Sequence, residues 1–143
     1  TCCEHGFRSY FIKMTELRDR MTSARRSGRE SNLLSYLVRP SCLIIDEVGH
    51  CEFDKENTRL FFDMVDRRYQ KEGYSNMVFT SNRDPAQWKE NFCENDALLC
   101  ALDRIFDDAV VFTIKGESFR GRKLETVALR TSTGSPADPQ QAG

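Results

Sequence analysis

The feature that most constrains the fold of this chain is a short apolar run, residues 42–45, which Asp46 and Glu47 follow at once. The run consists of Cys, Leu, Ile and Ile, and Pro40 stands two residues before it. An uninterrupted apolar run of this length is typical of a strand buried on both faces, as in parallel sheets. The two carboxylates would then lie at the carboxyl edge of the sheet, where α/β proteins gather functional residues.

Strand and helix signals alternate on either side of this run. We expect further strands at residues 7–12, 77–79 and 109–114, and a short one at 124–129. We expect helices at residues 15–26, 30–37, 54–71 and 96–106, and a short helix from Pro85 to near Trp88. Thr15 and Asp54 are the expected N-caps of the first and third helices. The alternation predicts an α/β fold, a three-layer parallel sheet with helices on both faces.

The domain boundaries follow from composition. The 143 residues suffice for one domain with a core, and we place it at residues 1–130. Residues 131–143 are rich in Ser, Thr, Pro and Gln without an apolar anchor, which predicts a disordered tail.

No apolar run approaches the roughly 18 residues of a membrane span, so no membrane partner is expected. The six cysteines form no C-x-x-C pair, which favours a reducing, cytoplasmic setting and no zinc site.

Polar residues end two of the expected strands. Asp46 and Glu47 follow residues 42–45, and Asn82 closes the Thr-Ser-Asn segment after residues 77–79. A carboxylate at such an edge suits Mg²⁺, and a second one can orient or deprotonate an attacking water. A side-chain amide can donate to a phosphate oxygen. Each residue taken singly equally fits an ordinary solvated turn.

Several arginines extend this pattern. Arg104 stands near the end of the expected helix 96–106, and Arg120 follows the expected strand 109–114. A guanidinium presents a fixed fork of donors that suits phosphate oxygens, although a surface ion pair explains either residue alone. Residues 8–39 carry eight basic side chains against three acidic ones, although the whole chain has a net charge of −1. This bias fits contact with phosphates or, equally, a solvated helix face.

In this order, the candidates resemble the AAA+ type of P-loop NTPases, and within them the IstB-like transposition helpers and the DnaC-like helicase loaders. The likeness covers residues 6–122. The segments that carry it are LIIDEVG (43–49), FDKE (53–56), FTSNRDPAQW (79–88), LDRI (102–105) and IKGESFR (114–120).

The resemblance implies ATP and Mg²⁺ as ligands and a role for each candidate. Asp46 and Glu47 would form the Walker B acid pair, with Asp46 on the metal, and Asn82 would be the sensor-1 residue. Arg104 would be the arginine finger that reaches a neighbouring subunit's site, and Arg120 the sensor-2 arginine. The arginines that the resemblance associates with DNA are Arg18, Arg20, Arg25, Arg26 and Arg29.

The G-x-x-x-x-G-K-[ST] loop that grips the phosphates of ATP does not occur in the sequence. In the family it precedes the part that corresponds to residues 7–12. We therefore expect residues 1–130 to be a partial AAA+ ATPase domain without its central P-loop strand, and to bind ATP weakly or not at all alone. Strands 75–81 and 109–115 would then have unpaired edges or pair directly.

The leading functional expectation is an ATP-dependent helper of DNA transposition that self-associates, binds DNA and engages a transposase. A replicative helicase loader, with the helicase as partner, shares every motif seen here. A non-catalytic remnant would retain only a DNA-binding or oligomerising surface. A metal-dependent nuclease would need more carboxylates beside Asp46 and Glu47, and Asp84 is the one nearby candidate.

Overall fold

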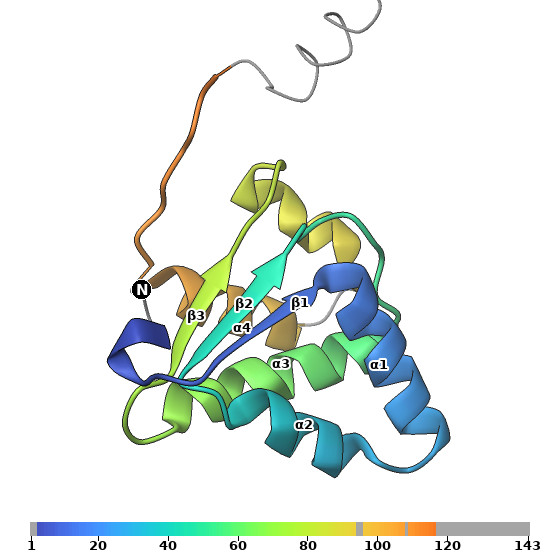
Figure 1. Ribbon diagram of the computed structural model, residues 1–143. Helices are drawn as coiled ribbons and strands as arrows, with labels where there is room; N and C mark the ends of the chain where they lie inside the picture. Colours follow the sequence, from blue (N-terminus) through green and yellow to red (C-terminus); the bar gives the residue numbers. More distant parts are fainter. Residues whose placement is uncertain (1–2, 94–95, 108, 117–143) are drawn as a thin grey trace, which may run out of the picture. The chain divides into compact units, whose positions relative to one another are not determined.

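The computed structural model describes residues 3–93, 96–107 and 109–116 (Figure 1). Residues up to Ala109 form one compact unit, and residues from Val110 onward belong to a second unit. The elements of the first unit are η1 (Cys3–His5), β1 (Ser9–Lys13), α1 (Met14–Arg26), α2 (Glu30–Val38), β2 (Cys42–Asp46), α3 (Lys55–Gln70), β3 (Asn76–Phe79), η2 (Pro85–Asn91) and α4 (Asp96–Asp107).

The three strands form a parallel sheet in the order β1-β2-β3. The register aligns Phe11 of β1 with Ile44 of β2, and Ile44 with Val78 of β3. The apolar run at residues 42–45 therefore forms the middle strand, with a hydrogen-bonded neighbour on each side. The predicted parallel α/β fold is confirmed.

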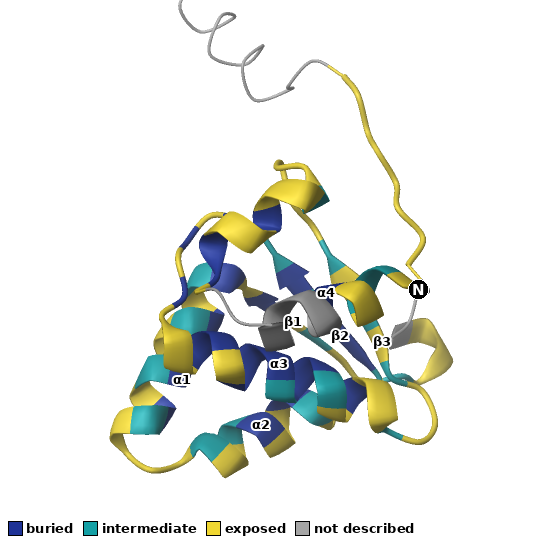
Figure 2. Cartoon of the chain, turned by 180° about the vertical axis from the view of Figure 1, so that it is seen from behind, coloured by how far each residue is buried: buried dark blue, intermediate teal, exposed yellow. Residues whose placement is uncertain are grey.

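Helices α1 to α4 lie on the same face of the sheet (Figures 1 and 2). Crossovers between parallel strands are almost always right-handed, so a strand order that advances in one direction places every connecting helix on one side. On the opposite face, Phe11 is 54% exposed and Val78 is 44% exposed. Of the two helical layers predicted from the sequence, the described residues supply this one. Within these described ranges, no helix is both long and apolar enough to span a bilayer.

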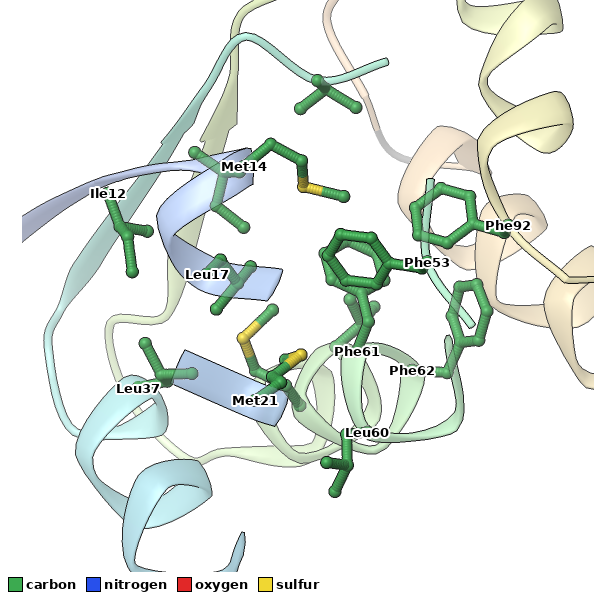
Figure 3. Packing of buried hydrophobic residues seen from close by; sticks show 14 of the residues in the cluster. Ile12, Met14, Leu17, Met21, Leu37, Phe53, Leu60, Phe61, Phe62 and Phe92 are labelled. Atoms are coloured by element: carbon green, nitrogen blue, oxygen red, sulfur yellow. The ribbon is translucent and has the colours of Figure 1, made fainter. Parts of the chain in front are cut away.

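The core lies between the sheet and this helical layer (Figure 3). Its aromatic part joins Phe53, Phe61, Phe62 and Phe92, with ring centroids of Phe61 and Phe92 5.1 Å apart. The side chains of α3 that reach this core recur at helical spacing, as the sequence predicted. Asp54 caps α3 as expected, because its side chain accepts a hydrogen bond from the Asn57 backbone N–H at 2.7 Å.

A buried arginine closes the amino end of the sheet. Arg68 of α3 is 1% exposed, and burial lowers the pKa of its guanidinium. Its Nη1 donates to the carbonyl oxygens of Leu37 (2.9 Å), Val38 (3.2 Å) and Pro40 (3.0 Å). Its Nη2 donates to the carbonyl of Asn76 at 2.9 Å. One side chain thus joins the end of α2, the approach to β2 and the start of β3.

Two local predictions are wrong. Residues 109–114 do not form a strand in the structure, and Phe112 and Ile114 are 83% and 94% exposed. An extended segment becomes a strand only when a neighbouring backbone completes its hydrogen bonds, and the described sheet ends at β3. Thr15 does not cap α1, which begins at Met14 after Lys13. The predicted strand 124–129, the predicted tail 131–143 and Arg120 lie outside the described residues.

Candidate functional site at the carboxyl edge of the sheet

Asp46 is the last residue of β2, and Thr80 directly follows the neighbouring strand β3. The Thr80 hydroxyl donates to Asp46 Oδ1. The same hydroxyl oxygen accepts the backbone N–H of Glu47 at 3.3 Å. Thr80 N–H continues the ladder by donating to the Ile45 carbonyl at 3.0 Å. This one threonine therefore fixes the positions of both adjacent acids.

Glu47 adopts an unusual backbone conformation. Its φ is 59°, the one left-handed value among the described residues that are not glycine. Such a conformation costs on the order of 1 kcal/mol in an L-residue, and it recurs at functional sites. The Glu47 carboxylate, with 40% of the side chain exposed, forms a 3.2 Å ion pair with Lys13 Nζ at the end of β1. The strained turn thus directs this acid along the carboxyl edge.

The loops that follow β2 and β3 are fastened to each other. Val48 N–H donates to the Thr80 carbonyl at 2.9 Å, and Ser81 Oγ donates to the Val48 carbonyl at 2.6 Å. Trp88 Nε1 donates to Ser81 Oγ at 3.2 Å, which attaches η2 to the same pair of loops. These bonds make the two loops one structural unit.

The side chains of His50 and Asn82 meet across this unit. His50 Nε2 lies 2.9 Å from Asn82 Oδ1, and both residues are exposed. Among the five candidates from the sequence, Asp46 ends β2, Glu47 lies on the loop that follows β2, and Asn82 lies on the loop that follows β3, so these three belong to the same edge of the sheet.

The other candidates lie elsewhere. Arg104 is on α4 and forms an ion pair with Asp66 of α3, so it belongs to the helical layer. Arg120 lies outside the described residues.

Sequence reasoning missed three residues of this edge: Lys13, Thr80 and His50. Lys13 and Thr80 stand at strand ends, and the logic that selected Asn82 would have selected them. His50 gave no such signal, since its contact depends on how two loops meet.

The edge has few groups that could hold a metal. Within the described ranges, no three His, Cys, Asp or Glu residues are grouped closely enough to bind an ion. Mg²⁺ often takes only one or two protein carboxylates and fills its other positions with water and substrate phosphates. Asp46 beside Glu47 fits that arrangement and does not fit a metal site made of protein ligands alone.

The basic residues proposed for DNA differ in their surroundings. Arg25 Nη1 binds both carboxylate oxygens of Asp54, at 3.0 and 2.9 Å, and also Asn57 Oδ1 at 3.1 Å. The hydrogen bond from the Asn57 backbone N–H, together with the bond from Arg25, lowers the pKa of Asp54. Arg25 therefore ties α1 to the start of α3.

Arg18 and Arg20 are also paired. Arg18 binds Asp19 at 2.8 Å, and Arg20 binds Glu16 at 2.7 Å. Arg26 and Arg29 are exposed, and neither makes an ion pair with any described residue. They lie at the turn between α1 and α2.

Known proteins are similar to this chain over nearly its whole length. Residues 1–126 match the family "IstB-like ATP binding protein". The chain is 30% identical over 118 residues to the "Insertion sequence IS5376 putative ATP-binding protein" of Geobacillus stearothermophilus, covering 82% of this chain and 46% of that protein. It is 33% identical over 112 residues to the "Insertion sequence IS232 putative ATP-binding protein" of Bacillus thuringiensis subsp. berliner, covering 78% of this chain and 44% of that protein. The chain thus spans about half the length of these relatives.

Solved structures show the same fold. AMPPCP-bound DnaA from Aquifex aeolicus superposes with a TM-score of 0.65 at 15% identity, over 91% of this chain and 38% of DnaA. At that identity the likeness concerns the fold, which is that of the AAA+ P-loop NTPases. The family match over residues 1–126 and the insertion-sequence relatives show that this chain belongs to the IstB-like ATP-binding protein family.

Proposed function

We propose that this chain is the sensing and hydrolysing part of an ATP-dependent helper of DNA transposition. The observation that carries the proposal is the placement of Asp46, Glu47 and Asn82 at the carboxyl edge of the sheet, at the end of β2 and on the two hydrogen-bonded loops that follow β2 and β3. The similarity to ATP-binding proteins of insertion sequences supports transposition as the setting. The reaction would be hydrolysis of ATP to ADP and phosphate.

Each residue of the edge would have its own task. Asp46 shares one oxygen with the Thr80 hydroxyl and keeps lone pairs for Mg²⁺ or one of its waters. Mg²⁺, when bound, would neutralise charge on the phosphates. Glu47 would accept a proton from the attacking water, for which its carboxylate has to share or leave the ion pair with Lys13. Asn82 would donate its amide to the γ-phosphate.

Arg104 would act on the site of a neighbouring copy, and Arg120 on the γ-phosphate. Arg104 would first have to leave Asp66, and its ion pair is half exposed, with side-chain exposures of 45% and 40%. An exposed pair contributes about 0–1 kcal/mol, so this release costs little. Self-association is therefore part of the proposal.

DNA would be contacted at the turn between α1 and α2. Arg26 and Arg29 are exposed there. Arg18 and Arg20 would have to exchange carboxylate partners for phosphates. Arg25 is engaged with α3 and would contribute less. A transposase is the proposed protein partner.

Two alternatives remain. A replicative helicase loader would use the same residues. A non-catalytic remnant would retain only a DNA-binding or oligomerising surface. Residues 1–143 do not contain the G-x-x-x-x-G-K-[ST] loop. We therefore expect the isolated chain to bind MgATP weakly or not at all.

A hybrid protein tests the ATPase proposal. The part of the Geobacillus relative that precedes the matched region would be fused to this chain, and MgATP binding and phosphate release would be measured. We expect Glu47→Gln to retain MgATP affinity within about twofold and to lose about 100-fold or more in turnover, the usual contribution of a general base. Glu52→Gln, at an exposed carboxylate of the same region, is the matched control and should change neither quantity. A folded hybrid that does not bind MgATP, or unchanged turnover in Glu47→Gln, would contradict the proposal.

DNA binding is tested on this chain by the double variant Arg26→Glu, Arg29→Glu. We expect weaker binding to duplex DNA and a smaller slope of log K against log salt, by about 2, since each phosphate contact contributes about 1. The control reverses Arg59 and Arg67, two exposed arginines of α3 that already form ion pairs. Equal losses of DNA affinity in the two variants would show that the effect comes from the change in net charge and not from these two positions.

A further inference from the structure

We propose that His50 is a positioning residue for Asn82. In this proposal the imidazole Nε2–H holds the oxygen of the Asn82 carboxamide, so that the NH₂ group and not the oxygen is presented to a phosphate. The inference rests on the γ-phosphate role proposed for Asn82.

The contact assigns opposite functions to the two ends of the carboxamide. His50 Nε2 lies 2.9 Å from Asn82 Oδ1, which is a full-strength hydrogen bond. The amide nitrogen of Asn82 makes no hydrogen bond with any other described residue. A carboxamide oxygen only accepts and its NH₂ only donates, so the bond that occupies the oxygen leaves the donor available.

An exposed asparagine without such a partner would present either end. Rotation by about 180° around the terminal torsion exchanges the oxygen and the nitrogen, and that torsion is broad and roughly two-fold. A phosphate oxygen is an acceptor and is repelled by the amide oxygen. A hydrogen bond that fixes the carboxamide in advance therefore removes the orientation that cannot bind a phosphate.

The backbone that carries His50 is held on both sides. His50 N–H donates to the Glu47 carbonyl at 3.2 Å and closes the turn. The side-chain nitrogen of Asn91, which is 7% exposed, donates to the Gly49 carbonyl at 3.0 Å and to the Cys51 carbonyl at 3.2 Å. The backbone of His50 is therefore part of a rigid loop, although the imidazole ring itself is exposed.

The partner loop is held as firmly. Ser81 Oγ donates to the Val48 carbonyl and accepts the backbone N–H of Arg83 at 3.0 Å, on the two sides of Asn82. Since both backbones are already fixed, the His50–Asn82 bond orders only two side chains. Its entropic cost is correspondingly small.

The bond does not require one protonation state of His50. The protonated imidazole carries Nε2–H, and so does the neutral ring in its Nε2–H tautomer. Either of these forms of the ring can therefore hold the Asn82 oxygen in the same way.

The first experiment uses this chain, labelled with ¹⁵N and ¹³C, and NMR of side-chain amides and imidazole nitrogens. We expect neutral His50 to be the Nε2–H tautomer. We also expect a scalar coupling across the hydrogen bond between His50 Nε2 and the Asn82 carboxamide carbon. The Asn82 NH₂ group should be rigid, with an order parameter near 0.8. In His50→Phe, which retains a ring and loses the donor, the order parameter should fall below about 0.6. His50→Gln, which restores an N–H donor, should recover part of the order.

Asn91 supplies the internal control. Its side-chain NH₂ resonances should not change in His50→Phe, because its acceptors are backbone carbonyls of the same loop. An Nδ1–H tautomer with Asn82 donating to Nε2, or an Asn82 amide equally ordered in wild type and His50→Phe, would overturn the inference.

The second experiment uses the hybrid protein and compares affinity for MgATP and MgADP. Loss of one oriented hydrogen bond should reduce the preference for ATP about three- to tenfold in His50→Phe, with partial rescue in His50→Gln. A hybrid that shows the NMR result but no preference for ATP refutes the role of Asn82 and with it the functional meaning of the contact. A hybrid that prefers ATP equally in wild type and His50→Phe refutes the positioning role alone.

Discussion

Replacing Arg68 by methionine tests how the amino end of the sheet is held. Methionine preserves most of the buried stem and removes the guanidinium. Nη1 carries two hydrogens and faces three carbonyl oxygens within 3.2 Å, so one of these bonds is shared, and Nη2 adds a further bond to Asn76. The substitution therefore deletes about three N–H donors and leaves their carbonyl acceptors unpaired.

The expected loss follows from these contacts. Hydrogen bonds to a charged group contribute about 1.5–3 kcal/mol each, and the lower figure fits here, because Arg68 Nε is buried without a partner. Three bonds at about 1.5 kcal/mol give about 4.5 kcal/mol. Methionine avoids the desolvation of a buried charge, which offsets part of that and leaves a loss of about 3 kcal/mol. The thermal midpoint of a domain of this size should fall by about 10–15 °C.

Urea unfolding of this chain, followed by circular dichroism, measures the loss. Arg68→Lys retains one charged nitrogen, so its free energy of unfolding should fall less than that of Arg68→Met. The lysine variant can therefore be compared with wild type even if the methionine variant does not fold. Arg67→Met is the matched control, since Arg67 adjoins it on α3 and its side chain is 48% exposed in an ion pair with Asp63. That control should lose at most about 0.5 kcal/mol. A loss below about 1 kcal/mol in Arg68→Met, or equal losses at the two positions, would refute the reasoning.

Three other substitutions probe the carboxyl edge and the start of α3. Glu47→Gly replaces a residue whose left-handed conformation costs about 1 kcal/mol, so the thermal midpoint should rise although the ion pair with Lys13 is lost. A lower midpoint would show that the ion pair contributes more to stability than the backbone conformation costs. Asp54→Asn removes a carboxylate whose pKa is lowered by folding, so its contribution exists above the ordinary aspartate pKa of about 3.9 and disappears as the pH falls through the lower folded value. Urea midpoints of wild type and Asp54→Asn should therefore converge in acid, and a difference independent of pH would contradict this account. Thr80→Val withdraws the hydroxyl from Asp46 and should cost about 0.5–1.5 kcal/mol in thermal unfolding, while Thr80→Ser should cost less.

The sequence was most informative where a signal is local. The apolar run at 42–45 and the run at 77–79 became neighbouring strands of the sheet, because burial and backbone pairing favour the same residues. The equally apolar residues 109–114 did not form a strand, since nothing in a run of side chains says whether a partner backbone is present. Composition therefore identifies segments able to form strands, and pairing decides which of them do.

The candidate site divides in the same way. Asp46, Glu47 and Asn82 could be selected because each ends or follows a strand. The contact of His50 with Asn82 could not, because it joins side chains of two loops 32 residues apart. Arg25 and Arg26 are adjacent and identical in type, yet one binds Asp54 and the other is exposed, since helical geometry turns successive side chains by about 100°.

Tolerance to mutation should differ between the two ends of the sheet. The amino end depends on Arg68, a single buried group that meets four carbonyls from three segments, and almost any change there destabilises the whole unit. The carboxyl edge depends on exposed hydroxyl, carboxylate and imidazole groups, each of which contributes little to folding. In a gene copy released from selection, drift would therefore change the side chains of the carboxyl edge long before it erased the fold. The persistence of this sheet in a diverging relative would then be no evidence that the arrangement of side chains at its carboxyl edge persists with it.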